Sequence, residues 1–267
     1  MGSMIALVKR YPLPVFFVLA YAFSWAAIAL VSISIVFPIL GLFGPAAAGL
    51  IVAGVTEGKH AAREIVGRLG IWRVGWRWYA IVVALPAAVA VGAAVVNRAL
   101  GEPWPTQLGE VGPLTLVVAV LIVGEELGWR GYALPRLLQA RAALLASLVL
   151  GLLWAGWHLP SFVYVEAAAS YGRSFLVFCV WVLPLTALIT WVFLHTRGSV
   201  LLASIFHAAT NLSVVIFNPG MDTERAWLLG GILMALIVLA LCFALGPELG
   251  RRQTSVAQQP PLEQQPA

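Results

Sequence analysis

Long apolar segments alternate with short polar ones along most of the chain. Each apolar segment holds about 17–25 residues, the length that a helix needs to cross roughly 30 Å of hydrocarbon. The pattern therefore predicts an all-α fold, a polytopic membrane helical bundle of about eight transmembrane helices. The predicted spans are residues 13–37, 39–55, 79–96, 113–132, 142–158, 174–194, 199–217 and 227–245.

The polar segments between the spans suggest the domain organisation. Pro38 separates the first two spans, and residues 58–69, which are polar and basic, fit an interfacial helix. Residues 1–246 form one predicted integral-membrane domain, whose polar motifs fall within residues 114–217. Residues 247–267 are rich in Gln and Pro, a composition typical of a disordered tail.

Composition and charge support this assignment and add an orientation. The chain is 61% hydrophobic and 10% charged, with a mean hydropathy of +0.95, whereas a soluble domain has about 25% charged residues. With the N-terminus inside, the inside segments hold 12 of the 16 Lys and Arg residues. Positive charge marks the cytoplasmic side, so both termini are predicted to be cytoplasmic. The outside loops hold Arg98, Arg173 and Arg225 together with Glu102, Glu110, Glu166, Asp222 and Glu224.

Three polar clusters interrupt the apolar spans. A charged side chain at the bilayer centre costs at least about 2.5 kcal/mol, so such residues are rarely kept without a partner or a function. Three separate clusters would each carry such a free-energy cost without a shared function, so we interpret them together as one site. The clusters are Glu125, Glu126 and Arg130; Trp154 and His158; and His207 and Asn211.

Helical spacing divides the roles of the two carboxylates. Glu126 and Arg130 are four residues apart, share a helix face and can pair. Glu125 lies about 100° round the helix and can point into a cavity, where it could act as a general base towards water. We expect the helix to continue inward to about Leu138, with a kink at Pro135, because Glu125 and His158 then lie at the same depth.

Two chemistries fit these residues. A divalent metal such as zinc, held by Glu126, His158 and His207, could activate water. Equally, Glu125 could activate water without a metal, with His207 and Asn211 donating to the oxyanion of a tetrahedral intermediate. Both chemistries predict hydrolysis of an amide within the membrane. The remaining histidines, His60 and His195, lie in predicted loops and are interpreted as ordinary loop residues.

The ordered clusters resemble the CPBP family, the intramembrane proteases that include the type II CAAX prenyl proteases and the Abi or bacteriocin-immunity proteins. The family pattern is E-E-x-x-x-R, then F-x-x-x-H, then H-x-x-x-N. Residues 125–130 and 207–211 match fully, and residues 154–158 match except that Trp154 replaces Phe. The resemblance implies an eight-helix membrane fold with the site in a cavity open towards the cytoplasm.

The resemblance also implies a role for each cluster residue. It implies Glu125 as the base, supported by Glu126 and His158, with His207 and Asn211 stabilising the oxyanion and Arg130 holding the motif in shape. The family is described both as metalloproteases and as glutamate proteases, so it leaves the cofactor open.

The leading hypothesis is an intramembrane endopeptidase acting on a membrane-associated or lipidated peptide or protein. Arginine outnumbers lysine 14 to 2, which favours a bacterial source and hence the inner or plasma membrane. The alternatives are a non-catalytic immunity or scaffold protein and a transporter. Against a transporter, the two halves of the sequence show no repeat. The basic pI of 9.6 needs no nucleic-acid partner, because cytoplasmic loops account for it.

Overall fold

The computed structural model describes residues 2–103, 107–163, 174–217 and 223–251. Within these ranges every regular element is a helix, which confirms the predicted all-α class. The predicted loop residues Glu166, Arg173 and Asp222 lie outside the described residues, as do residues 252–267 of the predicted tail. The predicted end of the domain at residue 246 therefore stays a prediction.

Each of the eight predicted spans is helical over most of its length. Among the described residues, four segments, Val36–Thr56, Trp76–Ala99, Phe175–His195 and Glu224–Leu245, are long and apolar enough to cross a membrane, and Pro12–Ile28, Ala143–Trp157 and Val200–Ile216 are shorter apolar helices. The chain is thus a multi-pass membrane protein, while eight crossings and cytoplasmic termini stay predictions. In chain order the spans are α2 (Pro12–Ile28), α3 (Val36–Gly41) with α4 (Gly44–Thr56), α6 (Trp76–Ala99), residues 113–140, α10 (Ala143–Trp157), α13 (Phe175–His195), α14 (Val200–Ile216) and α16 (Glu224–Leu245).

Shorter helices lie between the spans. The helix predicted over residues 58–69 is confirmed as α5 (Lys59–Gly67), followed by the 3-10 turn η1 (Arg68–Gly70). Among the described residues, two more short helices are α1 (Gly2–Arg10), which precedes the first span, and α11 (Pro160–Val163), which lies in a segment expected to be loop.

The predicted boundary between the first two spans is wrong. The helix α2 ends at Ile28, and Pro38 lies inside α3 instead of dividing the spans. A proline is tolerated in a first helical turn, because the N–H groups there have no intrahelical acceptor. The Ser24 hydroxyl donates to the Gly41 carbonyl at 2.7 Å, which fastens α3 against α2.

The fourth span extends as far as expected but is irregular at another place. It comprises α7 (Pro113–Leu121), α8 (Val123–Glu126), η2 (Leu127–Ala133) and α9 (Leu134–Ala140), so helical structure passes Leu138. The irregular turn is the π-helical η2, which immediately precedes Pro135 instead of centring on it. A proline ring excludes the normal bond to the carbonyl four residues earlier, and a wider turn accommodates this loss.

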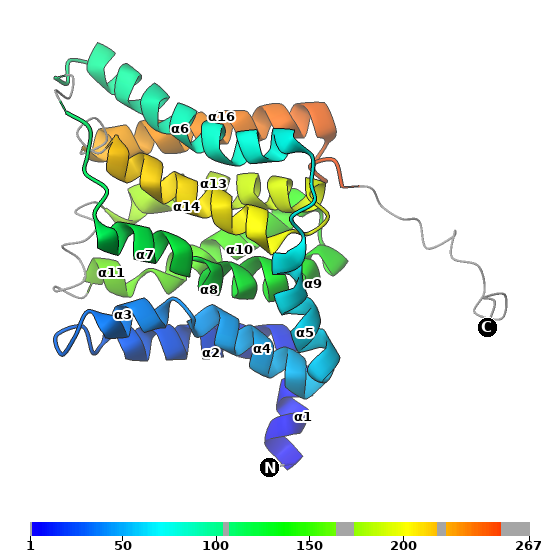
Figure 1. Ribbon diagram of the computed structural model, residues 1–267. Coiled ribbons are helices and arrows are strands. Elements are labelled where there is room, and N and C mark those ends of the chain that lie inside the picture. The colour runs from blue at the N-terminus through cyan, green and yellow to red at the C-terminus, as the bar shows by residue number, and fades with distance from the viewer. Residues whose placement is uncertain (1, 104–106, 164–173, 218–222, 252–267) are drawn as a thin grey trace.

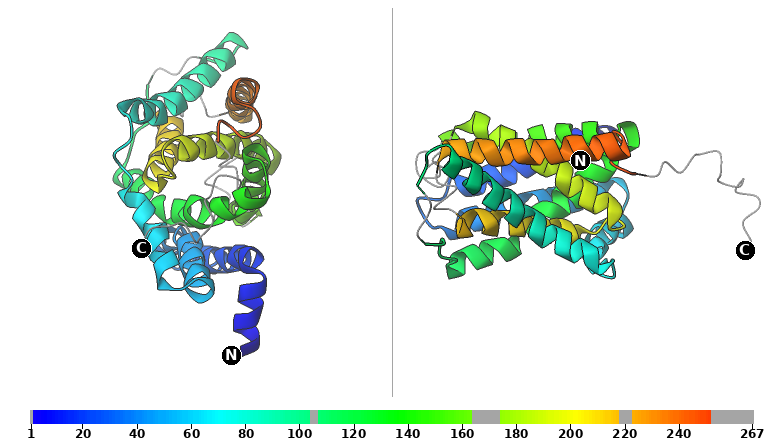
Figure 2. Two further views of the ribbon diagram at one scale, coloured as in Figure 1. Left: turned by 90° about the vertical axis from the view of Figure 1, so that its right-hand side faces the viewer. Right: turned by 90° about the horizontal axis from the view of Figure 1, so that it is seen from above.

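The main helices lie side by side with similar axes (Figure 1). α6 and α16 lie on one side of the bundle and α2 to α4 on the other. Between them lie residues 113–140, α10, α13 and α14, which the end-on view of Figure 2 shows grouped around the middle. Both described chain ends, α1 and the residues after α16, lie at the end of the bundle that carries α5 and α9.

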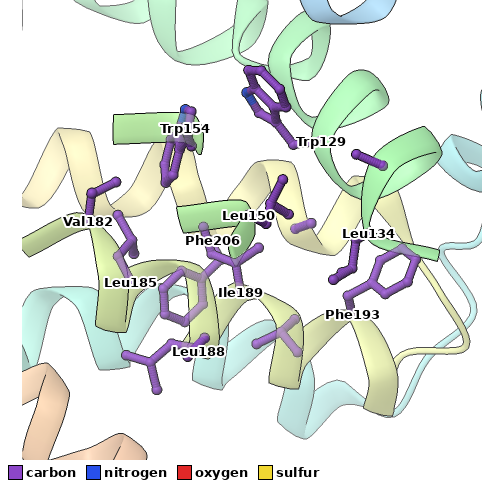
Figure 3. Close-up of a cluster of buried hydrophobic side chains, with 14 of the residues drawn as sticks. Trp129, Leu134, Leu150, Trp154, Val182, Leu185, Leu188, Ile189, Phe193 and Phe206 are labelled. Atoms are coloured by element: carbon purple, nitrogen blue, oxygen red, sulfur yellow. The ribbon is translucent and has the colours of Figure 1, made fainter. Parts of the chain in front are cut away.

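A core of large apolar side chains joins the middle helices. Figure 3 shows Leu150 and Trp154 of α10 facing Val182, Leu185 and Ile189 of α13. All of these side chains are buried, as are Trp129 of η2 and Leu134, the first residue of α9. The core therefore fixes η2, and with it the charged residues of the fourth span, against α10.

Close packing of η2 on α4 depends on Gly128. A Cβ at Gly128 would lie 2.4 Å from the Pro45 backbone, whereas a Cβ at Gly54 would meet nothing within 4 Å. We expect Gly128→Ala to lower the free energy of unfolding by about 1–3 kcal/mol through this overpacking. The matched Gly54→Ala should stay within about 1 kcal/mol of wild type. Thermal unfolding in detergent measures both; equal stability of the two variants would contradict the packing argument.

Candidate active site

A buried triad of charged and polar groups occupies the middle of the bundle. Glu126 Oε1 accepts hydrogen bonds from Arg130 Nη1 at 2.8 Å and from His207 Nδ1 at 2.9 Å. Glu126 and Arg130 are fully buried, and His207 is 4% exposed. The predicted pairing of Glu126 with Arg130 is confirmed, whereas the contact with His207, 81 residues away, was not foreseen.

The triad fixes the orientation of the His207 ring. Glu126 Oε1 accepts from the Arg130 N–H and also accepts from His207, so the hydrogen of the second contact lies on His207 Nδ1. The other ring nitrogen, Nε2, is then the one available to the cavity. Glu126 thus orients His207 in the way that a buried carboxylate orients a catalytic histidine.

Glu125 has a hydrogen-bond partner of its own, Trp154. Its Oε2 accepts a hydrogen bond from Trp154 Nε1 at 3.1 Å, and the residue is 3% exposed. The Trp154 ring also contacts the other charged groups, with its centroid 5.0 Å from the Arg130 guanidinium carbon and 4.9 Å from the His207 ring. Trp154 therefore joins all three clusters. The role of Trp154 as a hydrogen-bond donor was not predicted from the sequence. The family pattern has Phe at this position, and Phe has no side-chain N–H.

His158 ends α10 at the rim of the same site. Its Nδ1 donates to the Trp154 carbonyl at 2.9 Å. Its ring lies between aromatic neighbours, 4.7 Å from Trp157 and 4.9 Å from Phe178 between centroids. Because the carbonyl accepts only, Nδ1 carries the hydrogen of this contact.

A cavity of about 290 Å³ brings the clusters together. Glu125, His158, His207 and Asn211 all line it, as the interpretation of the three clusters as one site predicts. Trp157 and Ser161 line it too and were not singled out from the sequence. The rest of the wall is apolar: Ile28, Val31, Ile35, Pro38, Gly41, Leu42, Val118 and Ile122.

The histidines expected to be ordinary lie elsewhere. His60 is exposed in α5. His195 ends α13, where Nδ1 donates to the Trp191 carbonyl at 2.9 Å and the ring packs on Trp78. Neither lines the cavity.

A metal centre built from Glu126, His158 and His207 does not fit this arrangement. Glu126 Oε1 accepts hydrogen bonds, and the Nδ1 atoms of His207 and His158 carry hydrogens, so none of these three atoms can bind a metal in this arrangement. Among the described residues, no three His, Cys, Asp or Glu side chains come together in a way that could hold a metal ion. No chemical step is therefore derived through a metal.

Trp154 is expected to hold Glu125 in position for catalysis. Trp154→Phe keeps an aromatic ring but removes the donor, and a hydrogen bond to a charged group contributes about 1.5–3 kcal/mol. We expect kcat for peptide cleavage to fall roughly 10- to 100-fold with little change in KM. The control is Trp157→Phe, because Trp157 Nε1 has no hydrogen-bond partner among the described residues. If both variants cleave equally well, the Trp154 hydrogen bond has no such role.

The fold and the site together define a multi-pass membrane protein with a carboxylate and histidine cluster inside its helical bundle. Residues 107–213 match the family model described as Rce1-like, type II CAAX prenyl endopeptidase Rce1-like. This match spans all three clusters and confirms the resemblance of this part of the chain to the CPBP family.

Two curated proteins are similar to the chain. One is CAAX prenyl protease 2 of Methanococcus maripaludis, 33% identical over 120 residues, which cover 42% of this chain and 43% of that protein. The other is the L-methionine/branched-chain amino acid exporter YjeH of Escherichia coli, 27% identical over 209 residues, which cover 77% of this chain and 42% of that protein. The aligned regions span less than half of the length of either relative. The family and the first relative support a CAAX-type intramembrane protease.

Proposed function

We propose that the protein is an intramembrane endopeptidase in which Glu125 activates water without a metal. The observation that supports this most is the division of the two neighbouring carboxylates. Glu126 is bonded to Arg130 and His207, whereas Glu125 lines the cavity and accepts a hydrogen bond from Trp154. One carboxylate thus orders the site while the other faces the space where a substrate would lie.

The proposed reaction uses the groups that line the cavity. Glu125 takes a proton from a water molecule as its oxygen attacks the carbonyl carbon of the scissile peptide bond. The resulting oxyanion is stabilised by donors from His207 Nε2, when that ring is protonated, and from the Asn211 amide. Glu125 then gives the proton to the leaving amine nitrogen as the C–N bond breaks. His158, which lies at the rim of the cavity, supports Glu125 in this reaction.

The substrate is proposed to be a membrane-associated or lipidated peptide or protein, and the lipid bilayer is the other partner. The apolar cavity wall favours apolar residues on either side of the scissile bond. Location in the inner or plasma membrane of a bacterium remains part of the proposal. It rests on the basic segments and on the excess of arginine over lysine.

Removal of the oxyanion donor tests this function. The purified protein in detergent should cleave members of a broad library of apolar peptides. His207→Ala should lower kcat by about 10²–10³, the range seen when one oxyanion donor is removed. His195→Ala, which lies outside the cavity, should leave cleavage unchanged. Unchanged cleavage by His207→Ala would remove the assigned role, and an inactive wild type would favour a non-catalytic immunity or scaffold protein.

Transport is a second candidate, favoured by the similarity to the exporter. Buried Glu, Arg and His side chains also occur along proton and substrate pathways of transporters. Flux of methionine or branched-chain amino acids in liposomes containing the protein tests it. Flux that persists in Glu125→Gln, without any peptide cleavage by the wild type, would favour transport over proteolysis.

A further inference from the structure

The cavity lies towards one end of the bundle. Its lining includes Val31 and Ile35 from the turn after α2, Ser161 from α11 and Asn211 from the second half of α14. In Figure 1 the elements α3, α7 and α11 lie at the left, and this end is opposite to α5, α9 and the described chain ends. No residue of the α5 or α9 end lines the cavity.

The helical turn between the cavity and the α5 and α9 end is filled by side chains. All seven residues of η2 are buried, including Trp129, Arg130 and Tyr132. Beyond it, Arg251 Nη1 donates to the Leu138 carbonyl at 2.7 Å, so the residues after α16 pack onto α9. In the described part of the chain, the cavity is therefore separated from this end by protein and reaches the opposite end.

The two ends differ in charge. The end that carries α5, α9 and the chain ends holds eleven basic residues and three acidic ones among those described. The cavity end holds two described basic residues, Arg98 and Arg225, and three acidic ones, Glu102, Glu110 and Glu224. Moreover, Arg225 pairs with Glu102 at 2.8 Å. The basic end is the one that the positive-inside rule places in the cytoplasm.

Two expectations from the sequence therefore conflict. The charges place the termini in the cytoplasm, while the resemblance implies a cavity open towards the cytoplasm. The cavity and the described chain ends lie at opposite ends of one bundle, so both expectations cannot hold. The charges belong to this chain itself, and the difference between its ends is large, so they carry more weight than the resemblance.

We propose that the catalytic cavity opens on the non-cytoplasmic face of the membrane. Its substrate would then be an apolar segment of a membrane-anchored or exported protein that lies on that face, and not the tail of a cytoplasmic protein. This substrate class rests on the proposed endopeptidase function, whereas the orientation of the cavity does not.

Labelling of single cysteines in intact cells tests the orientation. After Cys179→Ala and Cys242→Ala, one cysteine is placed at the exposed Leu108, at the cavity end, or at the exposed His60, at the basic end. Neither Leu108→Cys nor His60→Cys changes the formal net charge of the protein when His is counted as neutral. A membrane-impermeant maleimide should label Leu108→Cys in intact cells, and His60→Cys only after permeabilisation. The reverse pattern would overturn the proposal.

A cysteine in the cavity wall tests the access route. Val31 lies in the turn after α2 and lines the cavity, and the unlabelled Val31→Cys variant is the reference for the effect of labelling. A bulky impermeant maleimide added outside intact cells should abolish cleavage of a co-expressed membrane substrate by Val31→Cys, and leave the His60→Cys variant active. Labelled Val31→Cys that still cleaves normally would overturn the access route. If no variant cleaves any substrate, the protease function fails, while the labelling pattern still decides the orientation.

Discussion

Replacing Glu125 by Gln is expected to lower the rate of peptide cleavage by at least about 100-fold, because a general base contributes roughly 10²–10⁴ in rate. Glutamine has nearly the same shape as glutamate, and its amide oxygen can still accept from Trp154 Nε1, which lies 3.1 Å from Glu125 Oε2. The amide cannot take a proton from water. The loss should therefore appear in kcat, without a change in thermal unfolding.

The matched control is Glu110→Gln. Glu110 is exposed and lies just before α7, so this variant removes a carboxylate from the same region of the chain without touching the cavity. It should cleave at the wild-type rate. A Glu125→Gln protein that keeps wild-type turnover would show that another group activates water.

Replacing Arg130 by Met should cause the largest loss of stability. Arg130 and Glu126 are both fully buried and 2.8 Å apart. Removing one partner of a buried ion pair leaves the other charge uncompensated, at a cost of about 3–5 kcal/mol. We expect this decrease in the free energy of unfolding in detergent, together with loss of cleavage, because Glu126 would no longer be held against His207.

Two comparisons isolate the buried charge as the cause. Arg68 and Glu64 are also four residues apart, but their side chains are 24% and 61% exposed, so Arg68→Met should cost no more than about 1 kcal/mol. The double variant Glu126→Gln with Arg130→Met removes both charges and should recover much of the stability. If Arg130→Met is as stable as Arg68→Met, the buried pair does not organise the site.

Local patterns predict a large part of this structure. Apolar spans of membrane length gave the eight helical segments, and the four-residue spacing of Glu126 and Arg130 gave their pairing. The cost of polar groups in an apolar bundle indicated that the three clusters meet, and residues of all three line one cavity. These features follow from periodicity and composition, which are properties of neighbouring residues.

Features that depend on distant contacts were not predictable in this way. The bond between His207 and Glu126 joins residues 81 apart, and the bond between Trp154 and Glu125 joins residues 29 apart. The break between Ile28 and Val36 lies inside a continuous apolar run, where hydropathy does not distinguish a helix from a turn packed among helices. The position of η2 likewise depends on packing against α4, not on Pro135 alone.

Cleavage by protein freed of metal tests the central claim most directly. The purified protein is treated with a strong chelator, its metal content is measured, and its cleavage of the peptide library is compared with that of untreated protein. We predict undiminished cleavage by metal-free protein, with Glu125 as the base. Stoichiometric zinc in the untreated protein, loss of cleavage on chelation and its return on adding zinc would contradict the account.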